Sequence, residues 1–102
     1  MTVSSPRITG PILKVLAEFC RRPTRPVSGI EISRSTGLAS GTLYPILFRL
    51  EKAGWVESEW EDAVPSIIKR PRRRLYRITG LGEENARASF REFLPAIPEF
   101  AK

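Results

Sequence analysis

The sequence predicts an α+β domain that is mostly α-helical, and three observations predict it. Apolar residues recur at helical spacing along residues 12–20 and 43–50, with a short capped segment between them. After Gly54 the period changes to a strand-like alternation, and a second alternating run follows a proline-containing basic loop. Two helices joined by a tight turn and followed by a two-stranded hairpin form the winged helix-turn-helix arrangement.

Local signals indicate where the helices begin and end. Pro11 suits the first turn of the first helix, and Ser28 with Glu31 has the spacing of a capping box at the second. Gly37 suits the left-handed residue that ends that helix. We expect Ser40 to cap the third helix, whose apolar face consists of Leu43, Ile46, Leu47 and Leu50.

Residues 55–60 and 74–78 are the two expected strands, joined by a loop that holds two prolines. The first strand is acidic, so we expect at least one of Arg74 and Arg77 to pair with it. Thr79 is the expected cap of a last helix, in whose first turn Gly82 is unfavourable. The hairpin residues expected in the core are Trp55, Val56, Trp60, Tyr76 and Ile78.

The net charge of +6, from 17 basic and 11 acidic residues, is concentrated in one segment. Residues 69–77 hold six basic side chains and no acidic one, a density typical of a phosphate-binding element. A solvated basic loop that binds nothing has the same composition. A membrane surface is a poorer fit, because these residues do not lie on a helix with a bulky apolar face.

Several classes of protein are excluded by what the chain lacks. It has no histidine, which removes a His-based triad and the common imidazole ligands, and no carboxylate dyad or phosphate loop is legible. We therefore expect no enzyme, no metal site and no cofactor. The single cysteine, Cys20, permits no internal disulfide and is expected to be a buried, inert thiol in a reducing compartment. No apolar run approaches the ~20 residues of a membrane span, and the first residues lack a secretion signal, so a cytoplasmic protein is expected.

Two motifs resemble a known family. GTLYPILFRLEKAGW at residues 41–55 and RPRRRLYRIT at residues 70–79, followed by Gly82, are similar to the recognition helix and wing of PadR-type transcriptional regulators. The resemblance implies a DNA-binding winged helix, a repressor, and a homodimer built by the first and last helices. It also implies a small aromatic effector as a partner. The sequence departs from the family pattern in the wing, where Lys69 replaces the usual glycine and Val64, Ile67 and Ile68 are apolar.

The expected DNA contacts come from a recognition helix at residues 40–53 and a basic wing at residues 62–74. For Tyr44, packing within the helix pair is the structural alternative, and for Arg49 it is pairing with a neighbouring acid. Glu51 is expected to be structural, because it would repel DNA. The predicted contact residues are Ser40, Thr42, Tyr44, Pro45 and Arg49 of the helix and Lys69, Arg70, Arg72, Arg73 and Arg74 of the wing.

The chain divides into an arm at residues 1–8, a DNA-binding domain at residues 9–79, and a helix and tail at residues 80–102. The last segment holds too many large apolar side chains for a terminus exposed to water, so we expect a dimer interface there. The alternative is a tail that folds back on its own domain. The expected interface residues are Leu13, Leu16, Phe90, Phe93, Leu94 and Ile97.

We therefore predict a sequence-specific DNA-binding transcriptional regulator that represses by occupying a palindromic operator as a homodimer. Two alternatives stay open. One is a winged helix used as a protein-interaction module, favoured by the apolar wing. The other is an architectural or recombination-directing protein that bends double-stranded DNA.

Overall fold

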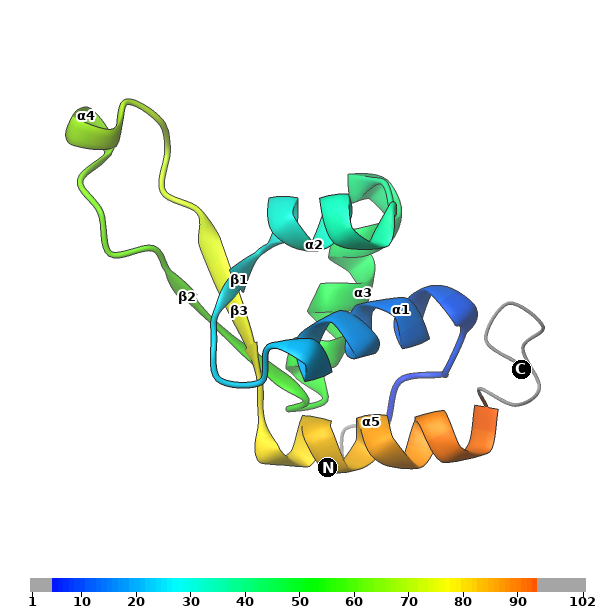
Figure 1. Ribbon diagram of the computed structural model, residues 1–102. Helices are drawn as coiled ribbons and strands as arrows, with labels where there is room; N and C mark the ends of the chain where they lie inside the picture. Colours follow the sequence, from blue (N-terminus) through cyan, green and yellow to red (C-terminus); the bar gives the residue numbers. More distant parts are fainter. Residues whose placement is uncertain (1–4, 94–102) are drawn as a thin grey trace.

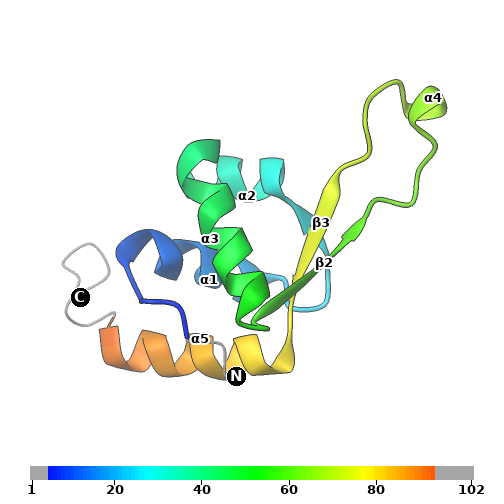
Figure 2. The ribbon, with the colours of Figure 1, turned by 180° about the vertical axis from the view of Figure 1, so that it is seen from behind.

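The computed structural model of the chain describes residues 5–93, which form a helical body with a long hairpin projecting from it (Figure 1). The same arrangement seen from behind shows the outer part of the hairpin standing away from the body, while its base lies beside the helices (Figure 2). The elements, in order, are α1 (Gly10–Arg21), β1 (Val27–Ser28), α2 (Gly29–Thr36), α3 (Ser40–Lys52), β2 (Val56–Trp60), α4 (Pro65–Ile68), β3 (Arg74–Ile78) and α5 (Gly80–Phe93).

The helix ends follow the sequence signals with one exception. Ser28 and Glu31 form the predicted capping box at α2, and Gly37 ends that helix in the left-handed region with φ 77°. The prediction that Ser40 caps α3 is wrong. Ala39 holds that position with an extended backbone, and its carbonyl accepts the Thr42 and Leu43 amides at 3.0 and 2.9 Å, so Ser40 is the first helical residue.

The sheet has three antiparallel strands in the order β1-β3-β2, where the sequence predicted two. The pairing of β2 with β3 sets Val56 opposite Ile78, and β1 adds Val27 opposite Tyr76. A strand of two residues is too short to show an alternating pattern, and the prolines before it indicated a loop. Its effect is to tie the start of α2 to the centre of the wing.

The wing loop also contains a helical turn, α4, that the sequence did not indicate. The amides of Ile67 and Ile68 donate to the Val64 carbonyl at 2.9 and 3.1 Å, and the Lys69 amide donates to Pro65 at 2.8 Å. Lys69 ends the turn in the left-handed region with φ 58°. Pro65 occupies the first turn, where its missing amide costs nothing.

The core lies between the helices and the inner face of the sheet. It takes the apolar faces of α1 and α3 together with Trp55, Val56, Tyr76 and Ile78, as predicted. Trp60 was expected there, and this is wrong: 59% of it is exposed. It lies where the hairpin has left the body, and its ring instead receives the Arg74 guanidinium at 5.0 Å from its centroid.

Gly82 is a requirement of the fold rather than a flaw in α5. A Cβ built at this position would overlap the Trp55 carbonyl and would lie 2.8 Å from Cγ1 of Ile78. The first turn of α5 therefore rests directly on the chain between α3 and β2. Thr79 caps the helix as predicted, because its hydroxyl accepts the Gly82 amide at 3.0 Å and donates to the Gly54 carbonyl at 2.6 Å.

Candidate nucleic-acid interface

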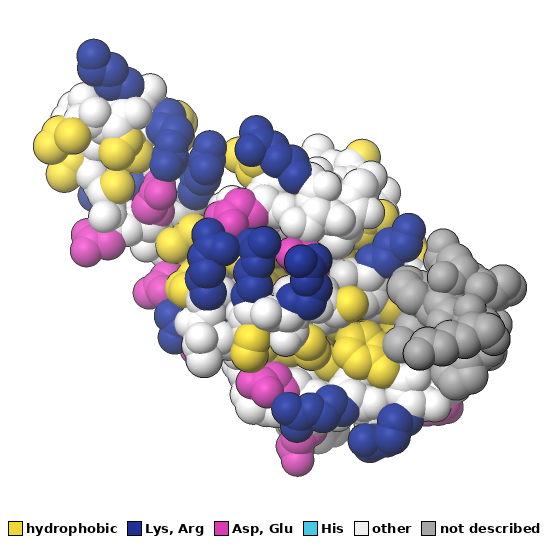
Figure 3. All heavy atoms as spheres, in the orientation of Figure 1, with side chains coloured by type: hydrophobic (Ala, Val, Ile, Leu, Met, Phe, Trp, Pro, Cys, Tyr) yellow, Lys and Arg dark blue, Asp and Glu magenta, His cyan; other side chains and the backbone are white. Residues whose placement is uncertain are grey.

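The N-terminal end of α3 and the tip of the wing lie at the same end of the molecule, at the top of Figures 1 and 2. Basic side chains gather along the wing and between the wing and the helical body, while hydrophobic side chains stand out at the wing tip (Figure 3). One face therefore presents a helix N-terminus beside a cationic hairpin. That combination suits a polyanion, because the free amides of the helix end and the wing cations both favour negative charge.

All the predicted contact residues of α3 are exposed. The ion pairs found within residues 5–93 do not include Arg49. Among the described residues, its side chain therefore does not form the pair with a neighbouring acid that was the alternative to DNA contact. Phe48, which the sequence placed off the core face but not among the predicted contacts, is also exposed and carries the Lys52 ammonium 5.4 Å from its ring centroid. Its position four residues after Tyr44 would have placed it on the same helix face. The predicted and exposed residues are Ser40, Thr42, Tyr44, Pro45 and Arg49.

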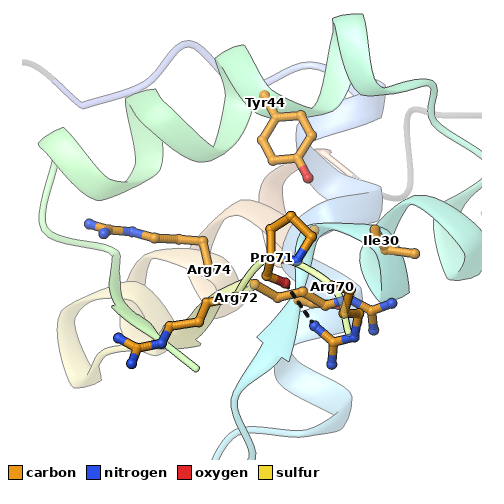
Figure 4. Close-up of a pocket in the computed structure, with 9 residues that line it drawn as sticks. Ile30, Tyr44, Arg70, Pro71, Arg72 and Arg74 are labelled. Atoms are coloured by element: carbon orange, nitrogen blue, oxygen red, sulfur yellow. Dashed lines mark hydrogen bonds between the residues drawn. The ribbon is translucent and has the colours of Figure 1, made fainter. Parts of the chain in front are cut away.

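Tyr44 packs within the helix pair, which is the structural alternative that the sequence left open. Its ring packs over Gly29, the first residue of α2, so closely that a Cβ there would overlap the Tyr44 hydroxyl. Part of the ring nevertheless stays exposed. The contact fixes the position of the hydroxyl, which points into the space between α3 and the wing (Figure 4).

That space is a cleft of about 350 Å³. Its walls are the first residues of α2, the Tyr44 side chain and the chain that leads into β3, as Figure 4 shows. Most of the predicted wing cations lie on it, so the structure brings them together with Tyr44. The lining residues are Ser28, Gly29, Ile30, Tyr44, Arg70, Pro71, Arg72, Arg73 and Arg74.

Arg70 is paired with an acidic residue of the wing, although 34% of its side chain stays exposed. Its two terminal nitrogens donate to the two Glu61 oxygens at 2.8 and 3.0 Å, and the Arg73 amide donates to the same carboxylate at 3.3 Å. The Arg70 hydrogen bond holds the pKa of Glu61 below its ordinary value and raises that of Arg70. This bidentate pair ties the two limbs of the hairpin together just beyond the sheet.

The other wing cations differ in how many hydrogen bonds they already make within the protein. Lys69 and Arg72 are exposed, and Arg72 donates one hydrogen bond, from Nε to the Ala63 carbonyl at 2.7 Å. Arg73 is half-buried. Arg74 donates from Nε to the Ser58 hydroxyl at 3.0 Å, so part of its hydrogen-bonding capacity is used within the sheet.

The expectation that an arginine of β3 pairs with the acidic strand is confirmed by Arg77, 3.6 Å from Glu59. Glu51 has the structural role expected for it, because it accepts the Ser58 hydroxyl at 2.5 Å and lies 3.9 Å from Arg74. Burial, then the nearby Glu51 carboxylate, raise the pKa of the Tyr76 hydroxyl. These groups form a polar layer between the end of α3 and the hairpin.

The residues expected at a dimer interface fall into three places. Leu13 and Leu16 are buried within the single chain, which corrects their expected place at the dimer interface. The apolar spacing that marks a face toward a partner also marks a face toward the chain's own core. Phe90 and Phe93 are half-buried on α5, with Phe90 against the core, and the predicted Leu94 and Ile97 lie outside the described residues.

Cys20 is half-buried beside the core, and burial raises the pKa of its thiol. Within residues 5–93, no three potential acidic or cysteine ligands come together to hold a metal ion. None of the helices there has the length and apolar character to cross a membrane.

The family model for the PadR-like family of transcriptional regulators matches residues 27–88, which include α2, α3 and the whole wing. The chain belongs to the PadR-like family. It is therefore a DNA-binding transcriptional regulator, and members of this family are regulators rather than enzymes. No curated protein matches the sequence.

Solved structures of similar proteins share the fold. AbfR of Staphylococcus epidermidis is 27% identical with a TM-score of 0.67, over 90% of this chain and 57% of its own. A PadR-family transcriptional regulator of Eggerthella lenta is 25% identical with a TM-score of 0.64, over 78% of this chain and 70% of its own. The smu.1704 protein of Streptococcus mutans is 25% identical with a TM-score of 0.65, over 91% and 81%.

Proposed function

We propose that this PadR-like protein is a repressor that binds a palindromic operator as a homodimer. In this proposal α3 enters the major groove with its N-terminal end, and the wing lies along the neighbouring minor groove. Repression follows from occupancy of the duplex. The protein works in the cytoplasm, and a small aromatic molecule bound between two subunits would tune its affinity.

One observation carries the proposal: the N-terminal end of α3 and the cationic wing lie at the same end of the molecule, with a cleft lined by arginines between them. A helix end that reads bases and a hairpin that binds phosphate must face the same duplex to act together. The free amides at the start of α3 and the guanidinium groups of the cleft supply the positive side of such an interface.

The contact roles follow from exposure. Ser40, Thr42 and Tyr44 carry hydroxyls at the end of α3 that would meet the groove, and Pro45 offers an apolar contact to a thymine methyl. Arg49, one turn further along, would meet a phosphate. In the wing, Lys69 and Arg72 are the exposed phosphate ligands, Arg73 and Arg74 line the cleft, and Arg70 shapes the hairpin through Glu61.

The dimer part of the proposal rests on α5. Phe90 and Phe93 lie half-buried along a helix at the edge of the body, and α5 packs against α1. On a palindromic operator, the two α3 helices of such a dimer would have to lie about 34 Å apart, one turn of DNA.

The test is fluorescence anisotropy with duplexes that tile the DNA upstream of the protein's own gene, at about 50 and about 200 mM salt. The proposal expects one palindromic duplex to bind far more tightly than the rest. Sedimentation should give two chains per duplex, and a reporter placed behind that operator should be repressed. A Thr42→Ala, Tyr44→Phe variant should lose preference for the operator while keeping its binding to other duplexes.

Equal, weak binding to every duplex, abolished at the higher salt, would refute the proposal. A single chain on an asymmetric site would refute its dimer part alone. Activation of the reporter would refute repression and leave operator binding in place. Addition of planar aromatic compounds to the bound complex tests the effector, which is supported if one of them releases the DNA.

A further inference from the structure

The tip of the wing carries large apolar side chains that no part of the described chain covers. Ile67 is 75% exposed and Val64 is 51% exposed. Ile67 lies within α4, and Val64 is the extended residue just before it, whose carbonyl accepts the Ile67 amide at 2.9 Å. Below them Trp60, Pro65, Pro71 and Arg72 line a shallow groove of about 590 Å³, which continues the apolar surface toward the strands.

This tip is a built structure rather than a slack loop. Three amides close α4 onto Val64 and Pro65, and Nε of Arg72 holds the Ala63 carbonyl at 2.7 Å across the hairpin. The pair of Arg70 with Glu61 then fixes the two limbs below the tip. The apolar side chains are therefore presented in a fixed position at the far end of the hairpin (Figures 1 and 3).

Cations surround the apolar tip. Between residues 62 and 74 the chain has five basic residues and one acidic residue, and Lys69 and Arg72, two and five residues after Ile67, are exposed. A DNA duplex is complementary to this pattern, because two rows of negatively charged phosphates flank the apolar faces of its stacked bases. Aliphatic side chains that enter between base steps from the minor groove unstack them and kink the duplex.

We propose that the wing tip is an apolar wedge: Ile67, supported by Val64, inserts into a base step of the minor groove beside the operator contact of α3 and bends the DNA. The inference rests on the proposed function, because it needs the wing to lie on the same duplex as α3. Lys69 and Arg72 bind the phosphates on the two sides of the step. The wedge adds affinity and deformation without reading a base.

The occupant is DNA rather than a protein or a lipid surface because of where the tip lies. It shares one end of the molecule with the exposed N-terminal end of α3, and the arginine-lined cleft joins the two. Its apolar surface is continuous with the cations of that cleft through Arg72, which lines both the cleft and the shallow groove.

The experiment uses the full-length protein and the operator duplex found by anisotropy, with 2-aminopurine placed at successive steps and a dye at each end. The wild-type protein should brighten 2-aminopurine at one step on the wing side of each half-site and raise energy transfer between the duplex ends. Ile67→Ala should abolish both signals and weaken binding by about tenfold, the loss expected when an aliphatic side chain's distal carbons are no longer buried.

Two matched variants separate the wedge from other effects. Leu81→Ala removes an apolar side chain that is 50% exposed on α5, at the opposite end of the molecule, and should change neither signal. Lys69→Gln should lower the slope of log affinity against log salt by about 0.9 for each chain, or about 1.8 for the proposed dimer, whereas Ile67→Ala should leave the slope unchanged because no phosphate contact is lost.

The inference is overturned if the operator binds tightly and no step brightens, and the proposed function then stands. It is also overturned if Ile67→Ala keeps affinity and bending but loses repression in cells, which would assign the tip to a protein partner. Binding of the wild type, but not of Ile67→Ala, to anionic phospholipid vesicles in preference to the operator would assign it to a membrane surface. If no duplex is preferred at all, the proposed function and the inference fail together.

Discussion

Replacing the wing cations one at a time separates those that meet phosphate from those that hold the wing together. Lys69, Arg72 and Arg73 have no carboxylate partner among the ion pairs of residues 5–93, whereas Arg77 pairs with Glu59 at 3.6 Å. Each variant to alanine removes one positive charge. If the wing attracts DNA only through its overall charge, all four changes should weaken binding equally. If individual side chains contact phosphates, the four changes should differ.

The magnitude follows from counterion release. Each phosphate contact contributes about 0.9 to the slope of log affinity against log salt, so the triple variant of Lys69, Arg72 and Arg73 should lower it by about 2.7 for each chain. In a dimer the loss should be about 5.4. Arg77→Ala also removes one positive charge, but Glu59 on the neighbouring strand already pairs with that charge. This variant should therefore change the slope by much less than the amount expected for one phosphate contact.

The assay is anisotropy on the operator duplex at five or more salt concentrations, with circular dichroism to show that each variant is folded. If Arg77→Ala lowers the slope as much as Arg72→Ala does, the wing acts through its overall charge and the assignment of contacts is refuted. Arg70→Ala is a different case, because it frees Glu61 inside the hairpin. It should weaken binding and also increase hydrogen exchange of the wing amides.

Three further predictions concern stability and reactivity. Gly82→Ala should lower the free energy of unfolding by about 2 kcal/mol, because the new methyl group meets the Trp55 backbone between α3 and β2. Gly80→Ala, with open space around it, should change that free energy by less than about 0.5 kcal/mol. Urea denaturation measures both. The lowered pKa of Glu61 means that its pair with Arg70 stabilises the wing above the ordinary pKa of 4.5 and is lost as the pH falls through the lowered value. The protection of the wing amides, taken relative to the intrinsic exchange rate at each pH, should therefore fall below that pH, and the Glu61→Gln variant should show low protection at all pH values. Because burial raises the pKa of Cys20, a disulfide reagent should modify it at neutral pH far more slowly than it modifies the unfolded chain.

The parts of the fold that sequence predicted well are those with a period or a cap. The apolar faces of α1 and α3, the capping box of Ser28 and the left-handed Gly37 depend on neighbours within one or two turns. A long-range contact leaves no such signal. Gly82 was misjudged on helix propensity alone, since nothing near it in the chain shows that the carbonyl of Trp55 will lie against it.

The candidate site follows the same division. The motif at residues 41–55 predicted which residues of α3 are exposed, because a helix with one apolar face must expose the others. The sequence pattern could not show that Arg70 would form an ion pair with Glu61, nine residues away across the hairpin. Trp60 was misassigned because alternation shows which residues share a face of a strand, but not where the strand leaves the body.

The short strand β1 has a mechanical consequence. Ser28 is at once the last residue of β1, opposite Leu75 in the wing, and the cap of α2, whose first residue packs against Tyr44 of α3. The wing and the helix pair are thus joined by adjacent residues and have no hinge between them. In the proposed complex, the distance between the α3 contact and the wing contact is therefore fixed. One base pair inserted between those contacts in the operator would rotate them out of phase by roughly 35°. The duplex would then have to twist, or the wing would lose its contact with the DNA.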